Sequence, residues 1–184
     1  QLSLDGRSIL YRAALSDMIV PYGDSDPMHS WKHVLDASEY NLGVFINSLK
    51  LGCDCLGEIH YFDINQVTWE GKIRTIENAI CMHEEDYGIQ WKHHDAQSQT
   101  TEVRRSRRLV ISSVFTVGNY DYGFYWYLYL DGTIQMEVKL TGIVGVSAVT
   151  EQTHNPSQAP LIAEGLASPV HQHSFCFRLD WELD

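Results

Sequence analysis

Two histidines separated by a single residue, His171 and His173, are the clearest candidates for metal chemistry in this sequence. On a β-strand, residues two apart point to the same face and lie roughly 7 Å apart. Two neutral imidazoles on one face can converge on a single ion, and nitrogen ligands of this kind suit Cu(II). The pair alone is a weak motif, so its context must decide whether it binds a metal.

Two other positions could take part in a reaction. Asp36 carries a carboxylate that could accept a proton if burial raised its pKa towards neutrality, although an aspartate in a turn is ordinarily a solvated cap. Tyr120 lies in an aromatic-rich segment, which on its own indicates core packing. Neither residue identifies a reaction without its surroundings.

The elements that must position these residues are predicted to be strands. Runs of β-branched and aromatic residues alternate with Gly, Asn and Asp turns, while helical periodicity is scarce. This pattern predicts an all-β, mainly antiparallel fold in one domain. The expected strands run from Gly57 to Asp63, Lys72 to Cys81, Gly88 to His93, Arg108 to Val117, Tyr122 to Leu130, Thr133 to Thr141 and His171 to Leu179.

The connections between these strands also carry signals. The segment Leu130-Asp131-Gly132-Thr133 predicts a hairpin with a two-residue turn at positive φ. A short helix or turn is expected between Ala37 and Leu51. The prolines between Glu151 and Pro169 predict a loop that interrupts the sheet.

Composition and charge limit the function classes. A chain of 184 residues that is 44% hydrophobic can bury a sizeable core, and it contains no run of about 18 apolar residues that would predict a membrane span. The formal net charge of -11 argues against nucleic-acid partners and favours cationic substrates. The one basic run, residues 104–108, is expected to be a solvated or ion-paired entry to an apolar strand.

The order Asn119-Tyr120-Asp121-Tyr122 resembles the signature of copper amine oxidases, in which the first tyrosine is self-processed to topaquinone. The resemblance runs across nearly the whole chain. It implies that residues 1–184 are the amino-terminal portion of a large β-sandwich catalytic domain whose carboxy-terminal portion is absent. Other segments that resemble family landmarks, in the family's order, are Gly52-Cys53-Asp54-Cys55-Leu56-Gly57, Cys81-Met82-His83-Glu84-Glu85-Asp86, Tyr129-Leu130-Asp131-Gly132 and His171-Gln172-His173.

The reaction that this resemblance implies is the oxidative deamination of primary amines to aldehydes, with consumption of O2 and release of H2O2 and ammonium. Copper and a topaquinone made from Tyr120 would be the cofactors. Asn119 would restrict the orientation of the ring, or would be only a turn residue at a strand end. Tyr22, in Val20-Pro21-Tyr22-Gly23-Asp24, resembles the family tyrosine that hydrogen-bonds the quinone oxygen.

Asp36 resembles the catalytic base of the family, because the residues that follow it match the family's segment of aspartate, Gly, Glu and Tyr with two departures. Ser38 stands where the family commonly has Gly, and Val34 stands where it commonly has an aromatic gate residue. The smaller Val34 is expected to leave the substrate channel less obstructed. Substrate preference therefore cannot be transferred from a relative.

The resemblance implies two metal sites. His171 and His173 would be two of three histidine ligands to copper, with the third expected beyond this chain, so the isolated fragment is expected to be inactive. A calcium-type site is expected at Asp180, Trp181 and Glu182, through carboxylates and a backbone carbonyl. A solvated terminal strand is the alternative for these three residues.

The resemblance also assigns the cysteines and the remaining histidines. Cys55 and Cys81 resemble the family's intrachain disulfide pair, which leaves Cys53 and Cys176 as free thiols. Family members are typically homodimers, and we expect the sheet-borne arms of that interface to lie outside this chain. The histidines that match no family copper ligand, and are expected to be surface or structural residues, are His29, His33, His60, His83, His93, His94 and His154.

Two alternative interpretations of the sequence remain beside that of an amine oxidase. The first is a noncatalytic β-sandwich binding module whose aromatic residues and histidines only pack. The second is a cupin-like metal dioxygenase, which would require an acidic ligand about four residues after His173, where this chain has Phe177. A quinone stain or a mass gain on the peptide that contains Tyr120 separates the enzyme from the binding module.

Overall fold

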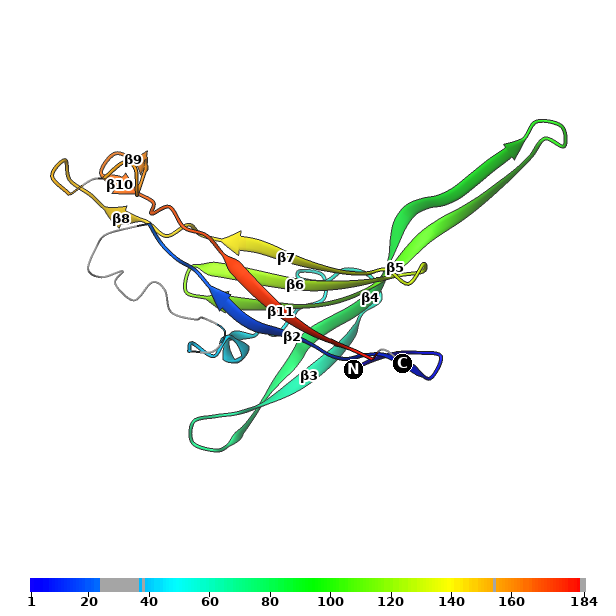
Figure 1. Cartoon of the computed structure of the whole chain (residues 1–184), viewed down its shortest axis with the longest axis horizontal. Coiled ribbons are helices and arrows are strands. Elements are labelled where there is room, and N and C mark those ends of the chain that lie inside the picture. Colours follow the sequence, from blue (N-terminus) through cyan, green and yellow to red (C-terminus); the bar gives the residue numbers. More distant parts are fainter. Residues whose placement is uncertain (24–36, 38, 154, 183–184) are drawn as a thin grey trace. The chain divides into compact units, whose positions relative to one another are not determined.

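The computed structural model describes residues 1–23, 37, 39–153 and 155–182. The chain divides into two compact units, Gln1–Gly43 with Ile143–Asp184, and Val44–Gly142. Both units consist of antiparallel strands, so the predicted all-β fold class is confirmed (Figure 1). Within the described ranges, no helix has the length and apolar character needed to cross a membrane.

The first unit contains two small antiparallel sheets (Figure 1). One has the order β1-β2-β11 and the other the order β8-β10-β9. The sequence pattern predicted only the last of these strands. Their bounds are β1 Leu2–Leu4, β2 Arg7–Ile19, β8 Ser147–Ala148, β9 Leu161–Ala163, β10 Leu166–Ala167 and β11 Ser174–Trp181.

The second unit is a five-stranded meander with the order β3-β4-β5-β6-β7. The 3-10 helix η2 (Leu42–Phe45) lies within the segment where a short helix or turn was predicted. Buried residues of two small clusters pack near the sheet, one around Ala79 and the other around Cys81. The strand bounds are β3 His60–Val67, β4 Ile73–Asp95, β5 Thr100–Val117, β6 Tyr120–Tyr129 and β7 Ile134–Gly142.

Strand β4 corrects the predicted break between Cys81 and Gly88. The strand is continuous but irregular: its register with β5 shifts between Asp86 and Ile89, where Gly88 has a φ of 92° and donates its backbone N–H to Asp86. Such a bulge bends a strand without ending it. The polar residues 83–86, which have weak strand propensity, therefore remain in β4.

Ion pairs hold this polar part of β4 against the basic run of β5. The pairs are Glu84 with Arg107, Glu85 with Arg108, and Asp86 with Arg105. Opposite charges directly across neighbouring strands favour their pairing. The expected ion pairing of residues 104–108 is confirmed, but the run lies within β5, which begins at Thr100, rather than at a strand entry.

The predicted hairpin at Asp131-Gly132 joins β6 to β7, but its turn differs from the prediction. Gly132 has a φ of 85° and donates its backbone N–H to the carbonyl of Tyr129, while Thr133 accepts from the backbone N–H of Tyr129. Leu130 and Asp131 do not have positive φ. The loop therefore has three residues and ends on a left-handed glycine, which is the second common hairpin connection.

The pairing of β4 with β5 continues to Asp95 and Thr100, well beyond the point where β5 and β6 pair at Arg108 and Tyr129. The result is a long two-stranded ribbon, coloured green in Figure 1. The ribbon extends the sheet within this chain, and the expectation that the sheet-borne dimer arms lie outside the chain stays a prediction. Its exposed apolar residues are Tyr87, Ile89, Trp91 and Val103.

Candidate functional site

Tyr120 is the first residue of β6 and follows a tight turn directly. Gly118 and Asn119 are the two residues between the paired positions Val117 and Tyr120, and Gly118 has a φ of 59°. A positive φ at the first central residue alone is the pattern of a type II′ hairpin turn. Asn119 is exposed and lies in this turn, so its position agrees with the turn role; its effect on ring orientation stays a prediction.

Gly142 lies opposite Tyr120 on β7 and has a φ of 101°. A Cβ at this position would overlap the carbonyl oxygen of Asn119 and would lie 3.0 Å from the backbone nitrogen of Asp121 and from the Cα of Tyr120. Only a glycine fits this approach without displacing the backbone. A role for Gly142 was not predicted from the sequence, although a glycine at a strand end is a signal for close backbone approach.

Asp121 is fixed by a small polar network. The hydroxyl of Thr116 donates to Asp121 Oδ1 at 2.5 Å, and the amide of Asn47 donates to Thr116 Oγ1 at 2.9 Å. Asp121 and Thr116 are paired across β5 and β6 and therefore share one face of the sheet, while the side chain of Tyr120 belongs to the other face. The network therefore fixes strand β6 at Asp121, the residue that follows Tyr120.

The predicted copper ligands lie next to each other in the first unit. The ring centroids of His171 and His173 are 5.1 Å apart, with an interplanar angle of 80°. Both residues precede β11, so the prediction that they belong to a regular strand is wrong; His171 instead forms an isolated bridge with Tyr22. The ring of Tyr22 stacks on His171 with centroids 5.1 Å apart.

The chemistry of this pair fits a metal site. His171 Nδ1 lies 3.0 Å from the carbonyl oxygen of Pro169, and an Nδ1–H bonded there fixes the tautomer whose lone pair, the one a metal binds, is on Nε2. Burial, and then the neighbouring His171, lower the pKa of His173, which favours the neutral imidazole that a metal requires. The part of the chain that the structure describes contains no group of three or more His, Cys, Asp or Glu residues that could bind a metal.

Tyr120 and Asn119 belong to the second unit, whereas Tyr22, His171 and His173 belong to the first. The proposed base Asp36, together with Val34 and Ser38, falls outside the described residues.

The residues of the expected calcium site have other partners in the structure. Asp180 Oδ1 accepts from Arg178 at 2.9 Å and Oδ2 accepts from Arg12 at 3.0 Å. Arg178 first, and then Arg12, hold the pKa of Asp180 below its usual range. Trp181 and Glu182 are exposed. The carboxylate is thus satisfied by two guanidinium groups, and calcium binding here stays a prediction.

Cys55 and Cys81 are both buried and belong to one apolar cluster with Leu49. The structure contains them as free thiols, as it does the exposed Cys53 and Cys176. The two buried cysteines are neighbours, but their disulfide stays a prediction.

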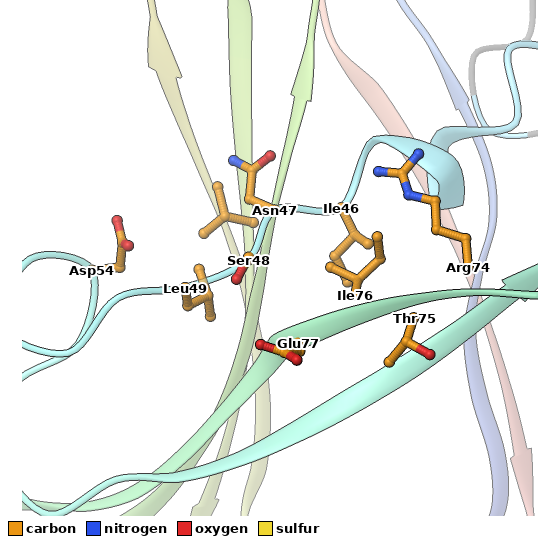
Figure 2. A pocket seen from close by; sticks show the side chains of 10 residues that line it. Ile46, Asn47, Ser48, Leu49, Asp54, Arg74, Thr75, Ile76 and Glu77 are labelled. Atoms are coloured by element: carbon orange, nitrogen blue, oxygen red, sulfur yellow. The ribbon is translucent and has the colours of Figure 1, made fainter.

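A pocket of about 700 Å³ lies in the second unit, between the segment that follows η2 and strand β4. Figure 2 shows Asn47 and Leu49 on one side and Arg74 and Glu77 on the other. Its lining combines the apolar side chains of Ile46, Leu49 and Ile76 with the charged side chains of Asp54, Arg74 and Glu77. None of the predicted site residues lines it.

The family of this chain follows from its similarity to known proteins. A family model described as "Copper amine oxidase, enzyme domain" matches residues 1–184. A primary amine oxidase of Arthrobacter sp. (strain P1) is 53% identical over 178 residues, which cover 97% of this chain and 28% of the relative. A histamine oxidase of Arthrobacter globiformis is 54% identical over 178 residues, which cover 97% of this chain and 26% of the relative.

A solved structure gives the same result for the fold. The chain matches the crystal structure of a copper-containing benzylamine oxidase from Hansenula polymorpha with a TM-score of 0.85 at 34% identity, over 97% of this chain and 28% of that one. The chain therefore spans about a quarter of the length of the relatives that it matches.

Proposed function

Because this chain belongs to the copper amine oxidase family, we propose that it forms part of an enzyme that oxidises primary amines to aldehydes while O2 is reduced to H2O2 and ammonium is released. Copper, together with a topaquinone derived from Tyr120, supplies the redox chemistry of this reaction. The observation that carries the proposal is the adjacent pair His171 and His173, with His171 oriented by a carbonyl and stacked on Tyr22.

The remaining roles in the proposed reaction belong to named side chains. His171 and His173 bind copper through neutral imidazoles, and a third histidine from a part of the enzyme outside these 184 residues completes the site. In this proposal, Tyr22 would donate a hydrogen bond to the quinone, and Asn119 would restrict the orientation of the ring. Without the third ligand, the 184 residues alone do not turn over an amine.

Asp36 is the proposed general base. It accepts a proton from the carbon next to the substrate nitrogen, which requires a carboxylate in hydrogen-bond reach with a raised pKa. The net charge of -11 is compatible with attraction of a cationic amine. The proposal includes a calcium site at Asp180, Trp181 and Glu182, in which calcium would displace the two arginines that hold Asp180 in this structure.

We also propose that the intact enzyme is a homodimer. The ribbon of β4 and β5 exposes Ile89 and Trp91, and a two-stranded hairpin with such residues is only marginally stable in water. A second subunit that covers the ribbon would bury this apolar surface. Sedimentation of the intact enzyme as a monomer at micromolar concentration would contradict this part of the proposal.

Turnover of the intact, copper-loaded enzyme tests the proposed reaction. Oxygen uptake after addition of a simple primary amine should be matched mole for mole by H2O2 and by ammonium. Tyr120→Phe should abolish uptake, while Tyr11→Phe, at an exposed tyrosine on β2 outside the proposed site, should leave it unchanged. Oxygen uptake that persists in Tyr120→Phe would refute the role of this residue.

A further inference from the structure

A line of hydrogen-bonded side chains lies on one face of β4 in the second unit. Cys81 Sγ lies 3.5 Å from His83 Nδ1, and His83 Nε2 lies 3.1 Å from Glu85 Oε1. Residues two apart on a strand share a face, so the thiol, the imidazole and the carboxylate follow one another in order. The second oxygen of Glu85 accepts from Arg108 Nε at 2.9 Å, which anchors the end of the line.

The thiol at the start of this line is part of a buried dithiol. Cys81 is completely buried, while the neighbouring Cys55 retains 6% of its exposure. Ser112 lies opposite Cys81 on β5, and its hydroxyl hydrogen-bonds the thiol. The hydroxyl of Tyr61 is also buried at this cluster, beside Cys55.

Cys81 needs a base in contact if it is to react. Burial, and then the neighbouring Cys55, raise the pKa of Cys81 to about 12, so the sulfur is protonated at neutral pH, and only a thiolate is nucleophilic. His83 is in contact with that proton. Since Glu85 accepts at Nε2, the neutral imidazole carries its proton there and presents the lone pair of Nδ1 to Cys81. This is the arrangement of an activated nucleophile with an oriented base.

We propose that Cys81, His83 and Glu85 form a thiol-oxidation relay, in which His83 accepts the proton of Cys81 as Cys81 closes a disulfide onto peroxide-oxidised Cys55. The pairing of the two cysteines is an expectation from the family resemblance, and the relay is the new element. Glu85 is a positioning residue, because it acts through His83.

The proposed chemistry balances in two steps. The sulfur of Cys55, the more accessible thiol, gives up its proton and attacks one oxygen of H2O2; the O–O bond breaks, and the departing hydroxide takes up that proton, so that a sulfenic acid and one water form. The sulfur of Cys81 then attacks the sulfur of Cys55 while its proton passes to His83 Nδ1. Hydroxide leaves Cys55 and takes that proton from His83 as a second water. Two thiols and one H2O2 thus give one disulfide and two waters.

The source of the peroxide rests on the proposed function, since H2O2 is a product of the proposed oxidase reaction, but the relay does not. The test therefore supplies H2O2 from outside and omits the amine. A protein without oxidase activity would still pass this test, and an active oxidase could fail it.

The experiment uses the intact enzyme, kept reduced with a phosphine that is removed before H2O2 is added. Closure of the disulfide is followed by mass as the loss of two hydrogen atoms across the Cys55 and Cys81 peptides, and the sulfenic acid is trapped with dimedone. His83→Gln is compared with wild type and with His60→Gln, an exposed histidine on β3. Thermal unfolding of each variant confirms that it is folded.

In His83→Gln, disulfide closure should slow by about 10² or more, which is the usual contribution of a general base, and dimedone-labelled Cys55 should accumulate. His60→Gln should behave as wild type. Glu85→Gln keeps the imidazole and should slow closure less than His83→Gln does. Closure at the wild-type rate in folded His83→Gln would overturn the relay, and so would a wild-type enzyme that forms no disulfide with H2O2.

Discussion

The close approach of Gly142 to the backbone at Tyr120 makes a quantitative prediction for Gly142→Ala. An alanine would have to adopt a φ of 101°, which costs about 1–2 kcal/mol for an L-residue. Its Cβ would also overlap the carbonyl oxygen of Asn119, and forcing such an overlap costs a further 1–3 kcal/mol or so. The strand pair that holds Tyr120 should therefore open more easily.

Gly132→Ala is the matched control for this prediction. Gly132 lies at the other end of the same β6–β7 hairpin, has a φ of 85°, and has nothing within 4 Å of an added Cβ. It should show the backbone strain without the overlap. The difference between the two variants isolates the contact with Asn119 and Tyr120.

Hydrogen exchange of the intact, copper-free protein measures this difference locally, because exchange from a strand reports the free energy of its opening. An extra 1–3 kcal/mol or so corresponds to exchange about 5- to 150-fold faster. We expect this acceleration in the peptide that contains Tyr120 and Asp121, for Gly142→Ala relative to Gly132→Ala. Equal exchange rates in the two variants would refute the reasoning.

Further predictions concern the base, the polar network and an ion pair. Asp36→Asn in the intact enzyme should allow quinone formation but lower amine turnover by about 10² to 10⁴, and near-normal turnover would exclude Asp36 as the base. Thr116→Val should speed exchange at the Tyr120 peptide because Asp121 loses a charge-assisted bond of about 1.5–3 kcal/mol, whereas Thr116→Ser, which keeps the hydroxyl, should not; equal effects would exclude the bond. The hydrogen bonds to Asp86, from Arg105 first, lower the pKa of its carboxyl group from 3.8 to about 2. The charged Asp86 therefore stabilises the folded protein fully at pH values above the pKa of the unfolded chain, and this stabilisation disappears as the pH falls to about 2. Thermal unfolding should therefore separate wild type from Asp86→Asn at neutral pH, with the two midpoints converging near pH ~2, and a constant difference would contradict the assignment.

The strands of the second unit could be predicted from the sequence because their side chains follow rules that are local. The aromatic run from Tyr122 and the alternating residues after Thr133 form β6 and β7 close to the predicted bounds. Strand β4 was predicted as two pieces because its middle is acidic. The partners that keep it in the sheet are arginines on β5, and such a compensation depends on pairing rather than on propensity.

The strands at the amino terminus were missed although a signal was present. Asp5 and Gly6 have φ values of 50° and 78°, which is the pattern of a type I′ turn, and they join β1 to β2. The same Asp-Gly pair was used correctly to predict the hairpin after β6. There, however, the turn has three residues, because the dipeptide alone does not determine which loop length the flanking register requires.

In the candidate site too, some features follow from the local sequence and others depend on contacts between distant segments. That His171 and His173 lie together follows from their spacing, but their place before β11 and the stacking of Tyr22 depend on a bridge between distant segments. Gly142 and Asn47 act on the backbone and on Asp121 from other strands and loops. No spacing along the chain connects them with Tyr120, so only the fold could reveal them.

The mass of the peptide that contains Tyr120 tests the central claim most directly. The intact protein would be prepared without copper under anaerobic conditions, and the peptide would be analysed before and after addition of copper and O2. We predict that Tyr120 alone gains two oxygen atoms and loses two hydrogen atoms, and only when both copper and O2 are present. An unmodified Tyr120 in folded, copper-loaded, full-length protein would contradict the assignment of this residue as the quinone precursor.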